Sequence, residues 1–175
     1  MRMLIWAEGQ KLRRSKIVWI TMFAVIMVAA IVFAQGQFTF YGSRYINGTG
    51  WYMTAVQSLA TLYVLPAVIA LLGSYMICRE EQEDTMKSLL LIPINESKLT
   101  MAKMVVSFVF SLLIYILLFV VTFLVEALLH FQELSAGIVL GFFKMYLLDG
   151  MGVFFAISPI IALVARMKKG YWLAL

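Results

Sequence analysis

Four long apolar segments dominate this chain and limit what it can fold into. They cover residues 17–34, 56–78, 104–124 and 145–165. A helix needs about 20 mainly apolar residues, at roughly 1.5 Å rise each, to cross a bilayer. Hydrophobic residues make up 63% of the 175 residues and charged residues 13%, whereas soluble domains carry about 25% charged residues. The sequence therefore predicts an all-α, polytopic transmembrane helix bundle that forms a single domain over residues 1–175.

Basic residues mark one side of this predicted bundle. The net charge is +5, but the bases cluster beside the apolar segments and not along a polar face, which excludes a nucleic-acid-binding protein. Only Arg44 and Lys144 fall on one side, whereas twelve bases fall on the other: Arg2, Lys11, Arg13, Arg14, Lys16, Arg79, Lys87, Lys98, Lys103, Arg166, Lys168 and Lys169. Because Lys and Arg concentrate in cytoplasmic loops, we expect both termini and residues 79–103 in the cytoplasm.

The loop over residues 79–103 carries the densest charge in the chain, in the stretch "REEQEDTMKSLLLIPINESKLTMAK". Acidic residues precede Met86, Leu89 and Leu90, whose three- and four-residue spacing predicts a short helix with an apolar ridge. Pro93 would end this helix, because proline has no N–H to donate. A solvated loop whose bases anchor the neighbouring spans is the alternative interpretation.

The first sixteen residues predict a basic amphipathic helix on the cytoplasmic membrane surface. Leu4, Ile5 and Leu12 can face the acyl chains while basic residues meet anionic headgroups. These membrane-interface anchors are Lys11, Arg13, Arg14 and Lys16. A plain basic tail that only sets topology is the alternative. We disfavour a cleaved signal peptide, because the apolar run that follows exceeds the usual signal length.

Two stretches resemble a known family. The order Arg79-Glu80, Thr85, Leu89-Leu90, Pro93 and Lys103 resembles the cytoplasmic loop between the second and third spans of type-2 ATP-binding-cassette (ABC) export permeases. The opening "AEGQKLRRSKIVWI" is similar to the start of the same family, and the wording is nearest to its bacitracin and lantibiotic resistance (immunity) branch. Asp84 stands where the family usually has glycine.

The resemblance implies a function. It implies the membrane-spanning permease subunit of an ATP-driven exporter in the bacterial cell membrane, which exports or confers resistance to antimicrobial peptides or hydrophobic drugs. The implied ATPase-coupling residues are Arg79, Glu80, Glu81, Thr85, Met86, Lys87, Leu89, Leu90 and Pro93. The chain would represent the first four of six spans, and "GYWLAL" at 170–175 would open a fifth.

Partners follow from the same resemblance. No stretch matches the phosphate-binding pattern G-x-x-x-x-G-K-[ST], so we expect a separate ABC-type ATP-binding subunit to bind ATP and magnesium. We expect no catalytic residue, cofactor or metal on this chain. The other expected partners are a second permease chain, the lipid bilayer, and a peptide or hydrophobic small-molecule substrate, but no nucleic acid.

Ionisable residues at the predicted outer ends of the third and fourth spans are further candidates. Glu126, Lys144 and Asp149 could line the outer part of a transport pathway, since ionisable residues at membrane depth are functional candidates. Ion pairing of Lys144 with Asp149 or Glu126 is the alternative. We expect residues 134–143 to form a separate short helix on the outer side, either re-entrant or interfacial.

Two other function classes remain open from the sequence alone. A non-transporting membrane adaptor or sensor would share the spans and the charged loop. An intramembrane enzyme built on Glu80-Glu81 is disfavoured, because such a site needs histidines or further acids to bind a metal or activate water. The single histidine, His130, is expected at the opposite membrane face.

Overall fold

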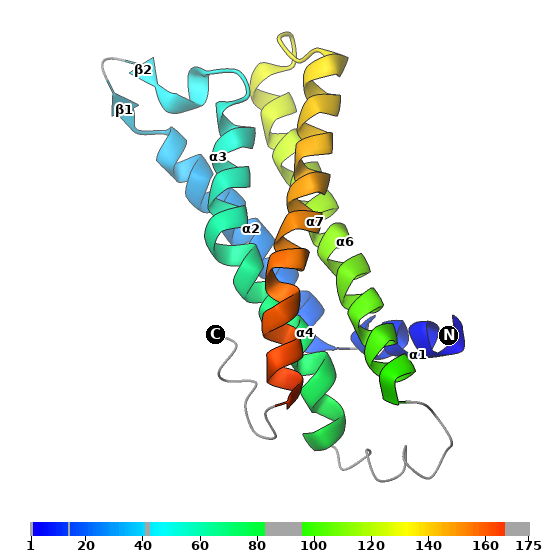
Figure 1. Cartoon of the computed structure of the whole chain (residues 1–175). Helices are drawn as coiled ribbons and strands as arrows, with labels where there is room; N and C mark the ends of the chain where they lie inside the picture. The colour runs from blue at the N-terminus through cyan, green and yellow to red at the C-terminus, as the bar shows by residue number, and fades with distance from the viewer. Residues whose placement is uncertain (1, 14, 41–42, 83–95, 167–175) are drawn as a thin grey trace.

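The computed structural model describes residues 2–13, 15–40, 43–82 and 96–166. Within them, four helices are long and apolar enough to cross a membrane: Lys16–Gly36, Trp51–Met76, Leu99–His130 and Ala136–Leu163. They run side by side as one elongated bundle (Figure 1). The predicted all-α polytopic bundle with four spans is confirmed.

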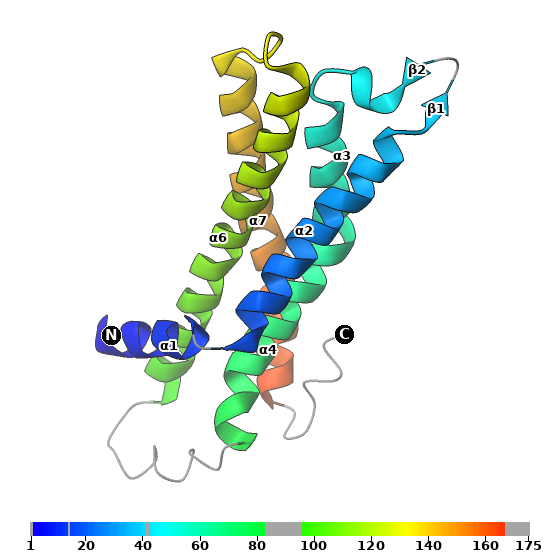
Figure 2. The same cartoon turned by 180° about the vertical axis from the view of Figure 1, so that it is seen from behind.

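Helix α1 (Arg2–Arg13) lies across one end of this bundle, and α2 (Lys16–Gly36) rises from it at a steep angle (Figure 2). Ser15 makes the corner. Its backbone is extended, and its hydroxyl accepts a hydrogen bond from the N–H of Ile17, which caps α2. The predicted N-terminal helix therefore ends at Arg13, and Lys16 is the first residue of the first span. We call this end the α1 end; the sequence predicts that it is cytoplasmic.

A compact connection joins the first two spans at the opposite end. Strands β1 (Thr39–Phe40) and β2 (Ser43–Arg44) pair antiparallel, and the 3₁₀ turn η1 (Tyr45–Asn47) follows. Gly50 then precedes α3 (Trp51–Leu59) with φ of 78°. Only glycine adopts this left-handed conformation without steric cost, so Gly50 sets the direction in which the second span begins.

The second span is one helix interrupted by a π-helical segment. It consists of α3, the π segment η2 (Ala60–Val64) and α4 (Leu65–Gln82). Pro66 follows η2 closely and cannot donate the backbone hydrogen bond of an α-helix. Local π geometry is one way in which membrane helices satisfy groups that a proline frees. The irregularity therefore has a cause in the sequence.

Helices α6 (Glu96–His130) and α7 (Ala136–Arg166) form a long hairpin (Figures 1 and 2). The prediction of a separate helix over residues 134–143 is wrong, because α7 begins at Ala136 and continues without interruption. The hydroxyl of Ser135 accepts a hydrogen bond from the N–H of Ile138 at 3.4 Å, which helps to start α7 at this point. Both spans are longer than the apolar windows that predicted them.

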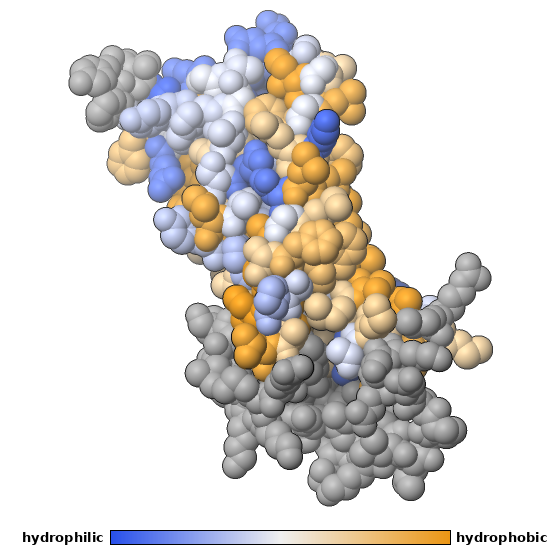
Figure 3. All heavy atoms as spheres, viewed as in Figure 1, coloured by the Kyte–Doolittle hydropathy of each residue, from blue (hydrophilic) through white to orange (hydrophobic). Residues whose placement is uncertain are grey.

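Tyrosines and glycines hold the bundle together. The Tyr52 hydroxyl donates to the Ala29 carbonyl at 3.0 Å, and the Tyr146 hydroxyl donates to the Met53 carbonyl at 2.8 Å. A Cβ on Gly150 would come within 3.0 Å of the Tyr115 ring, so glycine permits close contact between α7 and α6. The outer surface carries many exposed apolar side chains (Figure 3), as expected for a surface in contact with lipid.

Candidate functional site

The predicted ATPase-coupling residues are only partly covered by the structure. Arg79, Glu80 and Glu81 belong to the last turns of α4, at the α1 end of the bundle (Figure 1). The remaining six lie outside the described residues: Thr85, Met86, Lys87, Leu89, Leu90 and Pro93. The predicted coupling helix therefore stays a prediction. Its two neighbours, α4 and α6, reach the same end of the bundle.

Lys103 differs from its predicted place in a loop. It lies inside α6, is buried, and its Nζ donates to the backbone carbonyl of Met76 on α4 at 2.7 Å. The reason is that α6 begins at Glu96 and not near residue 104. Lys103 thus joins the second and third spans and is not part of a solvated loop.

The predicted membrane anchors have different surroundings. Lys11 forms an ion pair with Glu8 at 2.9 Å, and Glu8 is buried although Lys11 is not. Arg13 and Lys16 are exposed, on α1 and at the start of α2. Arg14 lies outside the described residues. These positions suit a helix on the membrane surface whose basic side chains reach the lipid headgroups. The buried carboxylate of Glu8 is paired with Lys11.

Glu126 is fully buried at the end of the bundle opposite α1. Its Oε1 accepts a hydrogen bond from the N–H of Gly50 at 2.7 Å, and Nδ1 of His130 lies 3.3 Å from the same oxygen. A carboxylate at the start of a helix satisfies a free N–H and interacts favourably with the helix dipole. Beside it, the Thr49 hydroxyl donates to Glu133. Glu126 therefore holds the start of α3 against the end of α6.

Asp149 lies elsewhere, at the boundary between α7 and the second span. Its Oδ2 accepts from Nε2 of Gln57 at 2.6 Å and from the Thr61 hydroxyl at 3.4 Å. The Tyr115 hydroxyl donates in turn to the Thr61 hydroxyl oxygen at 3.4 Å. Three helices thus contribute to one polar network around a half-buried carboxylate. Glu126 and Asp149, two of the three predicted pathway residues, therefore have separate sets of partners.

Lys144 joins neither carboxylate. It is exposed on α7, and within the described ranges no ion pair connects it to Glu126 or Asp149. The alternative ion pairs of Lys144 with Asp149 or Glu126 are therefore not observed, whereas Glu126 lies beside His130. The hydrogen-bond partners of Asp149 that the structure describes, Gln57 and Thr61, are both neutral. Within the described residues, no base forms an ion pair with its carboxylate.

A cavity of about 560 Å³ adjoins this network. One wall is polar and the other apolar, and the lining residues are Thr54, Gln57, Ser58, Thr61, Leu62, Phe142, Met145 and Asp149. In Figure 3, hydrophilic residues extend down the front face between α3 and α7 into the otherwise apolar belt. Thr61 belongs to the π segment η2, and π segments are frequent at functional sites. We name this space the Asp149 cavity.

The polar wall was missed in the sequence, although a signal was present. Thr54, Gln57, Ser58 and Thr61 recur at i, i+3, i+4 and i+7 in an apolar span, which places them on one helix face. Groups of three or more His, Cys, Asp or Glu that could hold a metal are absent from the residues that the structure describes. The polar wall of the Asp149 cavity can form hydrogen bonds, and the Asp149 carboxylate can attract a positive charge.

Comparison with known proteins identifies the family. Residues 4–175 match the family described as ABC-2 family transporter protein. The chain belongs to this family. Its four candidate spans fit a multi-pass membrane protein of this family.

A curated relative is similar over part of the chain. It is the bacitracin transport permease protein BCRB of Bacillus licheniformis, with 31% identity over 96 residues. The match covers 55% of this chain and 46% of the relative, so this ABC-2 permease aligns with less than half of that protein. No solved structure matches the chain.

Proposed function

We propose that this chain is the permease subunit of an ATP-driven exporter that removes antimicrobial peptides or hydrophobic drugs and so confers resistance to them. It would reside in the bacterial cell membrane with its N-terminus in the cytoplasm. The Asp149 cavity carries the proposal, because it is a polar space at membrane depth in a bundle that is otherwise apolar outside. Membership of the ABC-2 family and similarity to a bacitracin permease support it.

The lining of the Asp149 cavity suits an amphiphilic cargo. Asp149 and Gln57 offer polar contacts, while Leu62, Phe142 and Met145 offer an apolar wall opposite. A polar face left in contact with lipid would be costly. A second permease chain, identical or different, would cover the open side and complete a pathway between the two chains.

Coupling to ATP hydrolysis would use the loop over residues 79–103. In the proposal, Leu89 and Leu90 insert into a groove of the ATP-binding subunit, which binds ATP and magnesium. The span that contains Thr54, Gln57 and Thr61 continues as α4 to Gln82, and so includes the first residues of the 79–103 segment. Movement of the loop would thus reach the polar wall of the cavity along one helix.

Purification tests the partnership. Gentle detergent extraction of the tagged chain from its own cells, followed by mass spectrometry, should recover an ATP-binding subunit in stoichiometric amount. Replacing Leu89 and Leu90 by Asp should release that subunit and leave membrane insertion intact. Leu128→Asp with Leu129→Asp adds the same charges at the far end of α6 and should retain it. Unchanged recovery with the first pair of substitutions contradicts the coupling assignment.

Transport is tested separately. Cells that express the chain with its ATP-binding partner should lose peptide or drug resistance when Asp149 becomes Asn, at unchanged protein level. A chain that binds the partner but gives the same resistance with and without Asp149→Asn would instead fit a non-transporting adaptor or sensor.

A further inference from the structure

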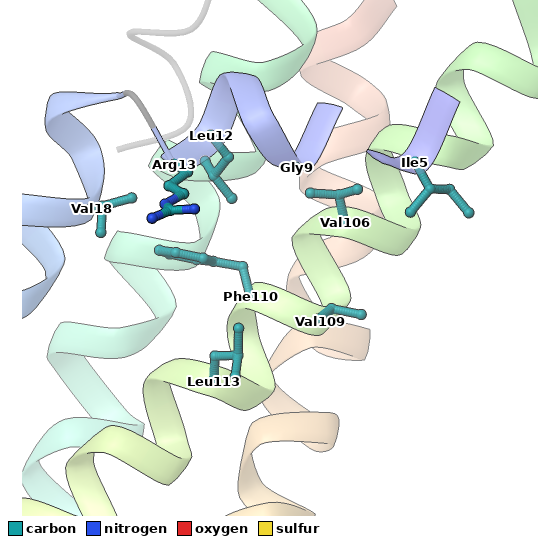
Figure 4. Close-up of a pocket in the computed structure, with 9 residues that line it drawn as sticks. All are labelled: Ile5, Gly9, Leu12, Arg13, Val18, Val106, Val109, Phe110 and Leu113. Carbon is teal, nitrogen blue, oxygen red and sulfur yellow. The ribbon is translucent and has the colours of Figure 1, made fainter. Parts of the chain in front are cut away.

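A second cavity lies at the α1 end, between α1, the start of α2 and α6 (Figure 4). Its volume is about 340 Å³. The lining residues that the structure describes are apolar or glycine except Arg13, and they are Ile5, Gly9, Leu12, Arg13, Val18, Val106, Val109, Phe110 and Leu113. Leu12 and Val106 form a buried floor, whereas Val109 and Leu113 are about half exposed. The cavity therefore opens on the apolar side of α6, where a bilayer would place acyl chains.

Among the described lining residues, only Arg13 carries a charge. Figure 4 shows the Arg13 side chain extending from α1 toward the ring of Phe110. Within the described residues no hydrogen bond or ion pair engages Arg13, whereas Glu8, the nearby acid of α1, is already paired with Lys11. A guanidinium has five donors arranged to bind phosphate through two of them at once. The Arg13 guanidinium at the rim therefore has no anionic partner among the residues that the structure describes.

The two parts of the cavity match the two parts of a phospholipid. Helix α1 lies across the end of the bundle (Figure 2), and a helix on the membrane surface holds its bases at headgroup level. The cavity extends from α1 along α6 as far as Leu113, and so lies on the membrane side of α1. Residues 106 to 113 span about 10 Å along α6, which gives an acyl chain a continuous apolar surface. Exposed Lys16 adds positive charge three residues after Arg13, which favours a headgroup with net negative charge.

We propose that this cavity binds one anionic glycerophospholipid from the leaflet on the α1 side. One acyl chain lies against Val106, Phe110 and Leu113, and the phosphate accepts hydrogen bonds from Arg13. The bound lipid would join α1 to the third span, and it would be distinct from any cargo in the Asp149 cavity. The proposal does not depend on what the permease exports.

Gly9 offers a sharp test, because it lines the cavity and a Cβ added there would meet nothing within 4 Å. Gly9→Leu should therefore fill the cavity without strain, and leucine is a better helix former than glycine. Gly141→Leu is the matched control, since Gly141 is also helical with nothing within 4 Å of its added Cβ and lies outside this cavity.

The measurement is native mass spectrometry of the full chain after delipidation and addition of phosphatidylglycerol or phosphatidylcholine. The wild type and Gly141→Leu should retain one phosphatidylglycerol in preference to phosphatidylcholine, and Gly9→Leu should retain neither. Arg13→Gln should bind both lipids about equally, whereas Arg44→Gln, a base at the opposite end, should behave as wild type.

Equal retention by the two glycine variants would overturn the acyl-chain site. A preference for phosphatidylglycerol that survives Arg13→Gln would overturn the headgroup contact. Asp149→Asn should leave lipid retention unchanged, which separates this site from the proposed transport pathway. If Asp149→Asn abolished lipid retention, the bound lipid would be cargo in the other cavity, and the proposed site would be wrong.

Discussion

Glu126 and Asp149 are both carboxylates within the helical bundle, yet their surroundings differ. Glu126 is fully enclosed and accepts a backbone N–H from Gly50. Asp149 is half-buried, accepts from the side chains of Gln57 and Thr61, and faces an open cavity. A backbone partner in a sealed space indicates a structural role, because nothing can enter or leave. Side-chain partners on a cavity wall can exchange for those of a ligand.

Removal of Glu126 should have the largest effect on stability. Glu126→Ala leaves the Gly50 N–H buried without a partner, and such a loss costs about 1–3 kcal/mol, to which the empty volume adds. Unfolding of the purified chain in mixed micelles should therefore require clearly less denaturant. Glu133→Ala is the control, since Glu133 is exposed and its contact with Thr49 is at the surface. Equal stability of both variants would contradict the structural role.

Asp149→Asn should show the opposite pattern. The amide has nearly the same shape and its oxygen can still accept a hydrogen bond from Gln57, so we expect the unfolding free energy to change by about 1 kcal/mol at most. Loss of the charge should reduce resistance or transport in cells with the partner subunit by about tenfold, which corresponds to roughly 1.4 kcal/mol. A loss of transport that only follows a loss of folded protein would place Asp149 in the same class as Glu126.

Gln57→Leu should weaken transport less than Asp149→Asn. It removes the 2.6 Å hydrogen bond to Asp149 but keeps the carboxylate. We expect a several-fold decrease, smaller than the tenfold loss above, because the carboxylate keeps its charge and still accepts a hydrogen bond from Thr61. Transport assays on membrane vesicles should rank the variants in this order. A larger effect for Gln57→Leu would mean that Gln57, and not Asp149, is the main contact.

Thr61→Val should have the smallest effect on transport. Its hydroxyl lies 3.4 Å from both Asp149 and Tyr115, and valine keeps the side-chain volume. Stability should change by about 0.5–1.5 kcal/mol at most, with transport close to wild type. A collapse of either property would indicate that the π segment itself depends on this hydroxyl.

Local sequence patterns predicted much of the fold. Hydropathy identified the four spans, and the basic N-terminus indicated α1. The corner at Ser15 and the uninterrupted start of α7 at Ala136 were not predicted, because a hydropathy window averages over caps and turns of a few residues. The candidate site was predicted less well. Gln57 and Asp149 are 92 positions apart, and no local pattern reports contacts over that separation.

The role of Glu126 could not be predicted from the local sequence either. Its position at the end of an apolar run suggested a pathway residue, but its role depends on Gly50, 76 positions earlier. The sequence does carry a signal for one polar helix face, in the spacing of Thr54, Gln57, Ser58 and Thr61. What it faces depends on α7, and only the folded structure shows that.

Accessibility to a charged thiol reagent tests the functional cavity most directly. With Cys78, the single cysteine, replaced by Ser, cysteines would be introduced one at a time at Ser58, Thr122 and Val120. Ser58 lines the Asp149 cavity, Thr122 is fully buried, and Val120 is exposed on the apolar surface. We expect a membrane-impermeant methanethiosulfonate to modify only the cysteine at position 58 in intact membranes. An unreactive cysteine at position 58, or equal reaction at position 120, would contradict a water-filled cavity at Asp149.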